Sequence, residues 1–163
     1  MKLKPSHIIV SFFVILCCLL SFVYGQGQMS WDDDFSPISL SNIQTKNQVR
    51  QGQSTTTLST TGDAEITADN STSARLNGPG GDSLNTEYGL AFDGSGTSET
   101  GGSSVAFTSY DLFLSTPAYV TYVTGDNNVD VTLRVRASNY AGDVANAGTY
   151  TATQTLTVSW VGP

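Results

Sequence analysis

The sequence has few of the residue types on which most catalytic sites depend. Its two cysteines and single histidine, Cys17, Cys18 and His7, all lie close to the N-terminus. The rest of the chain therefore offers no thiol or imidazole as nucleophile, general base or zinc ligand, and no disulfide. Carboxylate pairs remain as catalytic groups, but the acidic residues lie mostly in turn-like stretches. We expect no catalytic residues, no cofactor and no enzymatic activity.

Long hydrophobic runs are absent except near the N-terminus. Two lysines precede an apolar run over residues 8–20, and Val23 and Gly25 follow at positions that a signal peptidase reads. This order is typical of a secretory signal peptide, so we predict that residues 1–25 are cleaved. The run is shorter than the roughly 20 residues of a membrane span, although an uncleaved N-terminal anchor is the alternative. We expect a secreted or cell-surface protein with no membrane segment after cleavage.

Basic residues are scarce, and the predicted cleavage makes them scarcer. The chain has seven Lys and Arg against 14 Asp and Glu; removal of residues 1–25 leaves five against 14, a net charge of −9. Such a surface repels phosphate groups, so nucleic acid and anionic membranes are not expected partners. The remaining 138 residues are enough for one domain with one core.

The hydrophobic pattern after residue 54 is that of β-strands, because apolar and polar residues alternate. The clearest strand is residues 149–160, in which Tyr150 to Trp160 place every second residue inward and threonines outward. Residues Val129–Ala137 repeat the pattern with valine and leucine inward. Further strands are expected at Leu84–Phe92, Ala118–Thr124, Thr55–Thr60, Ala64–Ala68, Ser104–Thr108 and Tyr110–Leu114.

Glycine, asparagine and aspartate separate these segments at short intervals. Residues 77–82 read as a tight turn, residues 93–102 as a loop, and residues 124–128 as a hairpin turn that joins the two strands beside it. Seven or eight short strands with such turns predict an all-β, two-sheet β-sandwich of immunoglobulin-like, Greek-key form over residues 54–163. A closed barrel is the alternative.

Residues 26–53 read as an N-terminal extension of this domain. The segment is polar, but Ile38, Leu40 and Ile43 stand among serines and asparagine in a strand-like pattern. It is either a flexible leader or a donor strand that fills pockets in a neighbouring copy. We predict that residues 26–45 are the assembly element if assembly occurs, with these three side chains as its contacts.

The segment Ala147–Val158, which reads AGTYTATQTLTV, resembles the closing strand of pilin-like surface domains. Spore-coat-protein-U-like secreted pilins and related bacterial surface domains end in a similar "AGTYT…TVTV" segment. The resemblance implies an exported β-sandwich whose subunits assemble by lending a strand to a neighbour. This chain lacks the early disulfide cysteines of that family, which puts chaperone–usher assembly in doubt, and no functional residue is carried over.

Three features have the outline of a ligand site. Asp32-Asp33-Asp34 gathers carboxylates that calcium prefers, and Asp126-x-Asn128-x-Asp130 matches the start of a calcium loop but lacks its glycine and its final glutamate. We interpret both as solvated and expect no metal. The glycine-rich loop 94–102 has no following lysine and is no phosphate site.

Tyrosines are the remaining candidates, since Tyr119, Tyr122 and Tyr140 would suit a sugar-binding strip. Tyr119 and Tyr122 have opposite parity on one expected strand, so at most one of them faces outward. The sequence therefore favours a structural protein, a pilus, fibre or coat subunit that self-associates by β-strand addition. The alternative is a monomeric β-sandwich that binds carbohydrate or another ligand.

Overall fold

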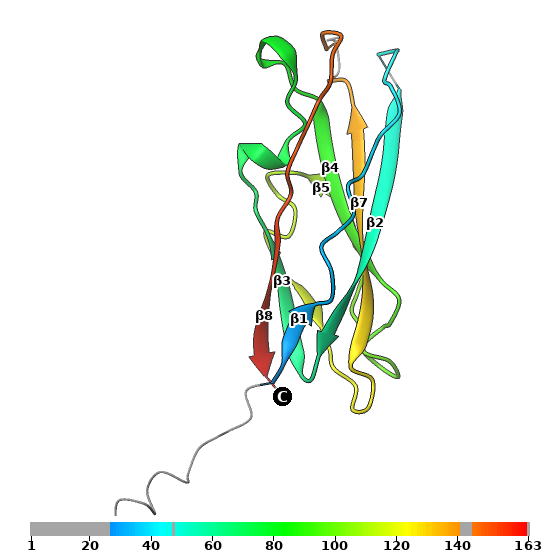
Figure 1. The fold of residues 1–163 in the computed structure, drawn as a ribbon, viewed down its shortest axis with the longest axis vertical. Coiled ribbons are helices and arrows are strands. Elements are labelled where there is room, and N and C mark those ends of the chain that lie inside the picture. Colours follow the sequence, from blue (N-terminus) through cyan, green and yellow to red (C-terminus); the bar gives the residue numbers. More distant parts are fainter. Residues whose placement is uncertain (1–26, 47, 141–144, 163) are drawn as a thin grey trace, which may run out of the picture.

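The computed structural model describes residues 27–46, 48–140 and 145–162; the predicted signal peptide lies outside them. Eight β-strands form two layers in this part of the chain (Figure 1). The strands are β1 (Met29–Trp31), β2 (Val49–Thr60), β3 (Asp63–Ala68), β4 (Asn85–Phe92), β5 (Val105–Ser109), β6 (Ala118–Val120), β7 (Asn128–Ser138) and β8 (Leu156–Gly162). Short 3₁₀ turns occur at Thr72–Ala74 and Pro79–Gly81. Among the described residues, no helix has the length and apolar character needed to cross a membrane.

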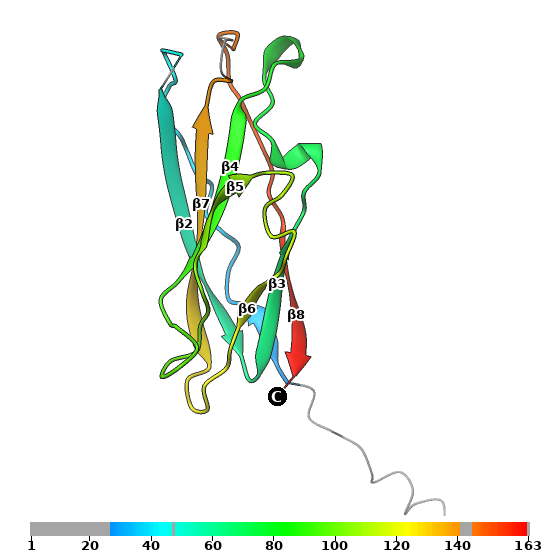
Figure 2. The same ribbon diagram turned by 180° about the vertical axis from the view of Figure 1, so that it is seen from behind.

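The two sheets are antiparallel and unequal. The larger has the order β1-β2-β7-β4-β5 and the smaller the order β6-β3-β8, as the opposite views in Figures 1 and 2 show. The prediction of an all-β chain with two sheets is thus confirmed. β2 and β7 have 12 and 11 residues, whereas no strand of the smaller sheet exceeds seven. The smaller sheet therefore covers only part of the inner face of the larger one.

β7 forms the centre of the larger sheet, and its sequence pattern predicted both the strand and its inward face. Its five inward residues Val129, Val131, Leu133, Val135 and Ala137 are all buried. The first four of them pack with Leu58 of β2, Leu90 of β4 and Ile66 of β3, so one apolar core lies between the two sheets. The predicted strands at Ala64–Ala68, Leu84–Phe92 and Ser104–Thr108 match β3, β4 and β5 to within one residue at each end, whereas the one at Thr55–Thr60 is only the second half of β2, which begins at Val49.

Two of the expected elements between β5 and β7 are wrong. Residues Tyr110–Leu114 form a turn, because the carbonyl of Ser109 accepts hydrogen bonds from the backbone N–H groups of Leu112 and Phe113. Residues 124–128 do not close a hairpin. β6 pairs with β3 in the smaller sheet and β7 pairs with β2 and β4 in the larger one, so this connection crosses between the layers.

The C-terminal segment forms a shorter strand than its alternation predicted. Only Leu156–Gly162 pairs with β3, and the stretch before it is held by an isolated bridge between Thr151 and Asn77 and by single backbone hydrogen bonds from Thr153 to Ser73 and from Asp69 to Thr155. The predicted parity is correct, since threonines 151, 153, 155 and 157 are exposed, but their alternating neighbours are only half-buried. The segment therefore lies along the rim of the core.

The free energy of unfolding depends on pH through Tyr88 in β4. Its ring contacts Phe113 with the centroids 5.5 Å apart, and its hydroxyl donates a 2.7 Å hydrogen bond to the carbonyl of Ala74. Burial raises the pKa of Tyr88 to about 12. Below pH 10 the phenol is protonated in both the folded and the unfolded chain, and its contribution to stability is complete. Between pH 10 and 12 only the unfolded chain loses this proton, so stability falls as pH rises.

We expect the wild-type chain to lose about 2 kcal/mol more unfolding free energy than Tyr88→Phe between pH 9 and 12. Urea unfolding at a series of pH values measures this difference. Parallel curves for the two proteins would mean that the phenol is solvated.

Candidate assembly site: the N-terminal segment and the open edge of β2

The chain before β2 starts as a strand and then leaves the sheet. β1 pairs with the end of β2 over three residues, from Met29 opposite Thr60 to Trp31 opposite Leu58. The last ladder bond joins the N–H of Asp32 to the carbonyl of Thr57 at 3.0 Å. Residues 33–44, which we call the covering segment, then run in front of the larger sheet toward the start of β2 (Figure 1).

The covering segment packs on the inner face of β2. The inward residues of this strand become smaller toward its start, from Leu58 through Thr56 and Ser54 to Gly52. An added Cβ on Gly52 would lie 2.5 Å from Cγ2 of Ile38 and 2.9 Å from Cδ2 of Leu40. The small residues thus leave the space that the segment's apolar side chains occupy.

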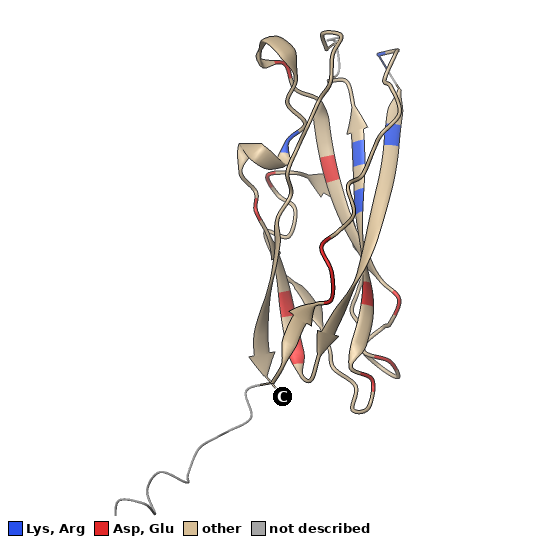
Figure 3. Ribbon diagram, in the orientation of Figure 1, with Lys and Arg blue, Asp and Glu red and all other residues tan. Residues whose placement is uncertain are grey.

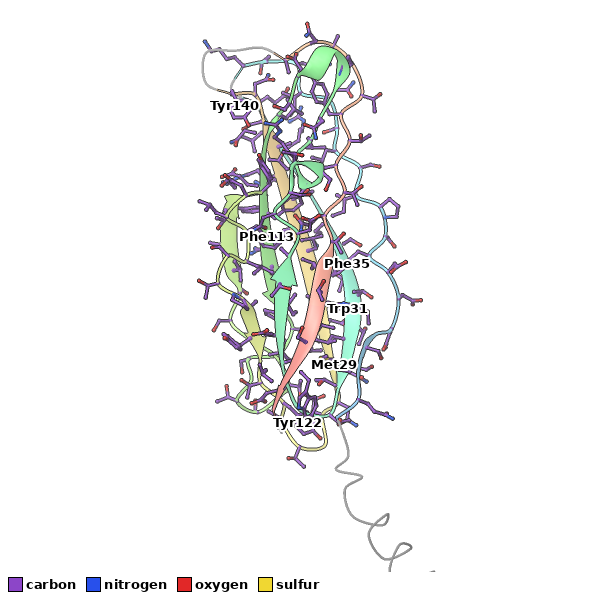
Figure 4. All side chains as sticks on the ribbon, turned by 90° about the vertical axis from the view of Figure 1, so that its left-hand side faces the viewer. Met29, Trp31, Phe35, Phe113, Tyr122 and Tyr140 are labelled. Atoms are coloured by element: carbon purple, nitrogen blue, oxygen red, sulfur yellow. The ribbon has the colours of Figure 1, made fainter. Side chains whose placement is uncertain are left out.

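The start of the covering segment is anchored by aromatic packing. Phe35 packs edge-on against Trp31 with ring centroids 5.6 Å apart (Figure 4). Met29, Trp31, Phe35, Ile38 and Leu40 are all half-buried against the core.

The predicted assembly residues therefore have intramolecular contacts in this structure. Ile38 and Leu40 pack against the core of their own domain, while Ile43 is half-buried but does not belong to that packing. The boundary expected between residues 53 and 54 falls inside β2, which begins at Val49. The sequence reasoning missed Gly52 and Ser54, although their alternation with polar residues was a visible sign of a face that receives other side chains.

Backbone hydrogen bonding to the covering segment is sparse. Within the described residues, no backbone N–H or carbonyl of residues 33–44 bonds to another backbone group. Side chains hold it instead: the hydroxyl of Thr56 donates to the carbonyl of Asp33 at 2.7 Å, and Nε of Arg50 donates to the carbonyl of Asn42 at 3.1 Å. Apolar burial thus supplies most of its attachment.

Because the covering segment turns inward, it leaves the outer edge of β2 open. The carbonyl of Thr57 faces β1, so the alternation of the ladder points the backbone groups of Thr55, Gln53 and Gln51 the same way. No backbone partner meets them in the described part of the chain, and all three residues are exposed. In Figures 1 and 2, β2 is the outermost strand on its side.

The outer face of the larger sheet carries an arginine–phenylalanine cluster beside this edge. Arg134 and Arg136 lie over the ring of Phe107, at 5.2 and 4.6 Å from its centroid, and Nε of Arg136 pairs with Glu87 at 2.7 Å. The hydrogen bond with Glu87 raises the pKa of Arg136. Nη2 of Arg134 donates to the carbonyl of Val105 at 2.9 Å, next to the irregularity where β4 and β5 change register. The cluster therefore braces β5 onto the sheet.

The acidic groups singled out in the sequence bond to hydroxyl and backbone N–H groups of neighbouring strands and loops, and Asp32 and Asn128 share the hydroxyl of Ser59. Asp126 accepts a 2.6 Å bond from the N–H of Thr100, Asp130 accepts one from the hydroxyl of Thr57, and Asp32 accepts one from the hydroxyl of Ser59. Among the described residues, no three metal-ligating side chains converge. Figure 3 shows that most acidic residues lie toward the end of the molecule where β2 ends, and the basic ones toward the other end.

The three tyrosines do not form one strip. Tyr122 and Tyr140 lie at opposite ends of the molecule (Figure 4). The hydroxyl of Tyr122 bonds to Asn127, whereas Tyr119 on β6 is 56% exposed. Tyr119 lines an open hollow of about 470 Å³ between the chain entering β5 and β6, whose other walls include Ser103, Ser104 and Pro117.

Comparisons with known protein families, with curated proteins and with solved structures find no match to this chain.

Proposed function

We propose that this chain is a secreted or cell-surface structural subunit that self-associates by β-strand addition. The observation that carries the proposal is the open edge of β2 at residues 51–55. An unpaired strand edge is a template for another strand, because its backbone donors and acceptors already point outward in register. Here the edge exists because the covering segment buries its side chains on the inner face of β2 and leaves the sheet at Asp33.

The pilin-like resemblance of Ala147–Val158 and an immunoglobulin-like, Greek-key arrangement of the two sheets belong to the same proposal. The strand order β2-β7-β4, in which chain neighbours are separated in the sheet, favours that arrangement. The proposal also includes export of the chain with cleavage of the signal peptide after Gly25.

Proline at position 53 tests the role of the edge. Gln53→Pro removes an N–H that points away from β7, so it takes a donor from the open edge and none from the ladder inside the molecule. We expect the full-length chain, expressed with its own N-terminal segment, to form ordered polymers by negative-stain microscopy. The proline variant should stay monomeric at the concentrations at which the wild type assembles, because the concentration needed for assembly should rise at least tenfold.

Gln53→Ala is the matched control, since it shortens the side chain and keeps the N–H. It should assemble as the wild type does. A wild-type chain that stays monomeric at every concentration and salt tested would refute the proposed function, as would polymers that form equally well with proline at position 53.

A second candidate function, the binding of neutral carbohydrate, is favoured by the hollow beside Tyr119. An exposed aromatic ring stacks on the apolar face of a sugar, and hydroxyl groups bond to its edge. No charged side chain lines this hollow, and among the described residues the hydroxyls of Ser103 and Ser104 make no hydrogen bond. These features suit a neutral polyhydroxylated ligand.

For this candidate, affinity electrophoresis in gels with xylan, mannan, dextran or β-glucan should show retardation by at least one of the four. Tyr119→Ala should weaken that binding at least tenfold, whereas Tyr140→Ala, which removes an exposed ring at the far end of the molecule, should leave it unchanged. No retardation by any of the four polysaccharides, or equal loss in both variants, would exclude the hollow as a sugar site.

A further inference from the structure

β5 presents a second open edge on the opposite side of the same sheet. It is the last strand in the order β1-β2-β7-β4-β5. The N–H of Tyr110 donates to the carbonyl of Thr86, so the alternation of the ladder points Thr108 toward β4, and Phe107 and Ser109 away from it. Within the described residues, the backbone groups of Phe107 and the N–H of Ser109 have no backbone partner on that outer side, whereas the carbonyl of Ser109 already accepts the N–H groups of Leu112 and Phe113.

The two open edges lie at the same level of the sheet. One row of paired residues runs from Gln51 of β2 through Arg136 and Glu87 to Ser109 of β5. A second row, nearer the middle of the sheet, runs from Ser54 through Leu133 and Leu90 to Val105. β5 therefore spans the rows in which the edge of β2 has no partner.

A lateral shift of one copy brings these edges together with the correct geometry. β2 and β4 are each antiparallel to β7, and β5 is antiparallel to β4, so β5 of one copy meets β2 of the next in antiparallel orientation. The row that ends at Ser109 meets the row that begins at Gln51. Phe107 then lies opposite Gln53 and can form both bonds of a hydrogen-bonded pair, whereas Ser109 can give only its N–H, to the carbonyl of Gln51, because its own carbonyl is already bonded within the turn.

Neither edge carries a charge or a proline that would oppose such pairing, although β5 is short, with five residues, and irregular in its register with β4. The stretch Gln51–Thr55 reads QGQST and β5 reads VAFTS, without a charged residue or a proline. Natural sheets commonly place lysine, proline or an inward charge on exposed edges. β1 occupies the edge of β2 only beside residues 58–60, so the incoming β5 would lie in line with β1 and extend the same column of strands.

We propose that the partner of the β2 edge is β5 of a second copy of this chain, which joins the larger sheets into one continuous antiparallel sheet. The inference rests on the proposed function and specifies its contact. Each copy uses two different edges, so the contact is heterologous and does not close into a dimer. The product is a fibre whose strands lie across its axis.

The geometry fixes the rise per subunit. At the level of contact each copy contributes four strands, β2, β7, β4 and β5, so the rise is about 19 Å for a strand spacing of about 4.8 Å. End-to-end joining would instead give about 40 Å or more, because β2 alone has 12 residues at about 3.3 Å each. Helical reconstruction of negatively stained or frozen fibres measures this rise.

Two cysteines provide an independent test of the register. In the double variant Gln51→Cys/Ser109→Cys, the new thiols face each other only between copies, at the 5.5 Å Cα separation of a hydrogen-bonded pair, which permits a disulfide. Mild oxidation should give a ladder of covalent multimers on non-reducing gels. The control Thr57→Cys/Ser109→Cys displaces one thiol by six residues along β2 and should give at least tenfold less ladder.

The outcomes separate this inference from the proposed function. Fibres with a rise near 19 Å and a ladder specific to the 51/109 pair support the lateral contact. Fibres with another rise, or without that ladder, overturn it and leave self-association intact. No assembly at all refutes the proposed function itself.

Salt gives a further check. Lateral stacking places the acidic ends of successive copies side by side, so the copies repel each other and raising NaCl from 10 to 500 mM should promote assembly. End-to-end stacking would instead bring acidic and basic ends together, and the same increase in NaCl should weaken it.

Discussion

Replacement of Leu133 with aspartate is expected to prevent folding. Leu133 lies in the middle of β7, is 5% exposed, and packs in the core between the two sheets. Aspartate at this position removes the packing of a leucine and buries a carboxylate that has no cation within the core. Together these effects exceed roughly 4 kcal/mol, a large part of the stability of a domain this size. Loss of the cooperative urea transition and of soluble yield measures it.

Two positions on β8 provide graded controls. Thr157→Asp places the same charge on an exposed site and should change the unfolding free energy by less than about 1 kcal/mol. Val158→Asp should fall between the two, because Val158 is packed against the core but only half-buried. Equal damage at Thr157 and Leu133 would mean that the outer face of β8 is covered in solution.

The larger loss of stability expected at Leu133 than at Thr157 follows from the side of the strand on which each residue lies, and the alternation of apolar and polar residues in the sequence determines that side. In β7, five inward residues in strict alternation predicted both the strand and its buried face, because side chains alternate sides whatever the neighbouring strands are. Alternation does not say which strands pair. Residues 118–124 were therefore expected to form a hairpin with β7, whereas Ala118–Val120 joins the other sheet.

The same limit explains the outcome for the candidate site. Ile38 and Leu40 were predicted to fill pockets in an open sheet, and they do lie against the small inward residues of β2. The sequence does not say whose sheet receives them, because that depends on how the chain before β2 folds back. The open edges of β2 and β5 were equally hidden, since an edge is defined by the absence of a neighbouring strand.

Removal of the side chains of Ile38 and Leu40 is expected to destabilise the monomer. Fully buried isoleucine or leucine costs about 2–5 kcal/mol on replacement with alanine, and these half-buried residues should cost less, about 3 kcal/mol for the pair. The double variant should therefore melt about 10 °C below the wild type. Ile43→Ala is the matched control, because Ile43 does not pack against the core cluster, and its melting temperature should change by no more than about 2 °C.

A bulkier residue at position 52 tests the same packing from the opposite side. Gly52→Val places a Cβ within 2.5 Å of Ile38 and 2.9 Å of Leu40, so the covering segment must move away from β2. We expect a loss of stability similar to that of the double variant, together with at least tenfold faster protease cleavage within residues 33–44. Combining Gly52→Val with the double alanine variant should cost less than the two effects added, because both disrupt one contact. A chain that lacks residues 27–45 and melts as the wild type does would contradict this packing and identify the segment as a leader that its own domain does not need.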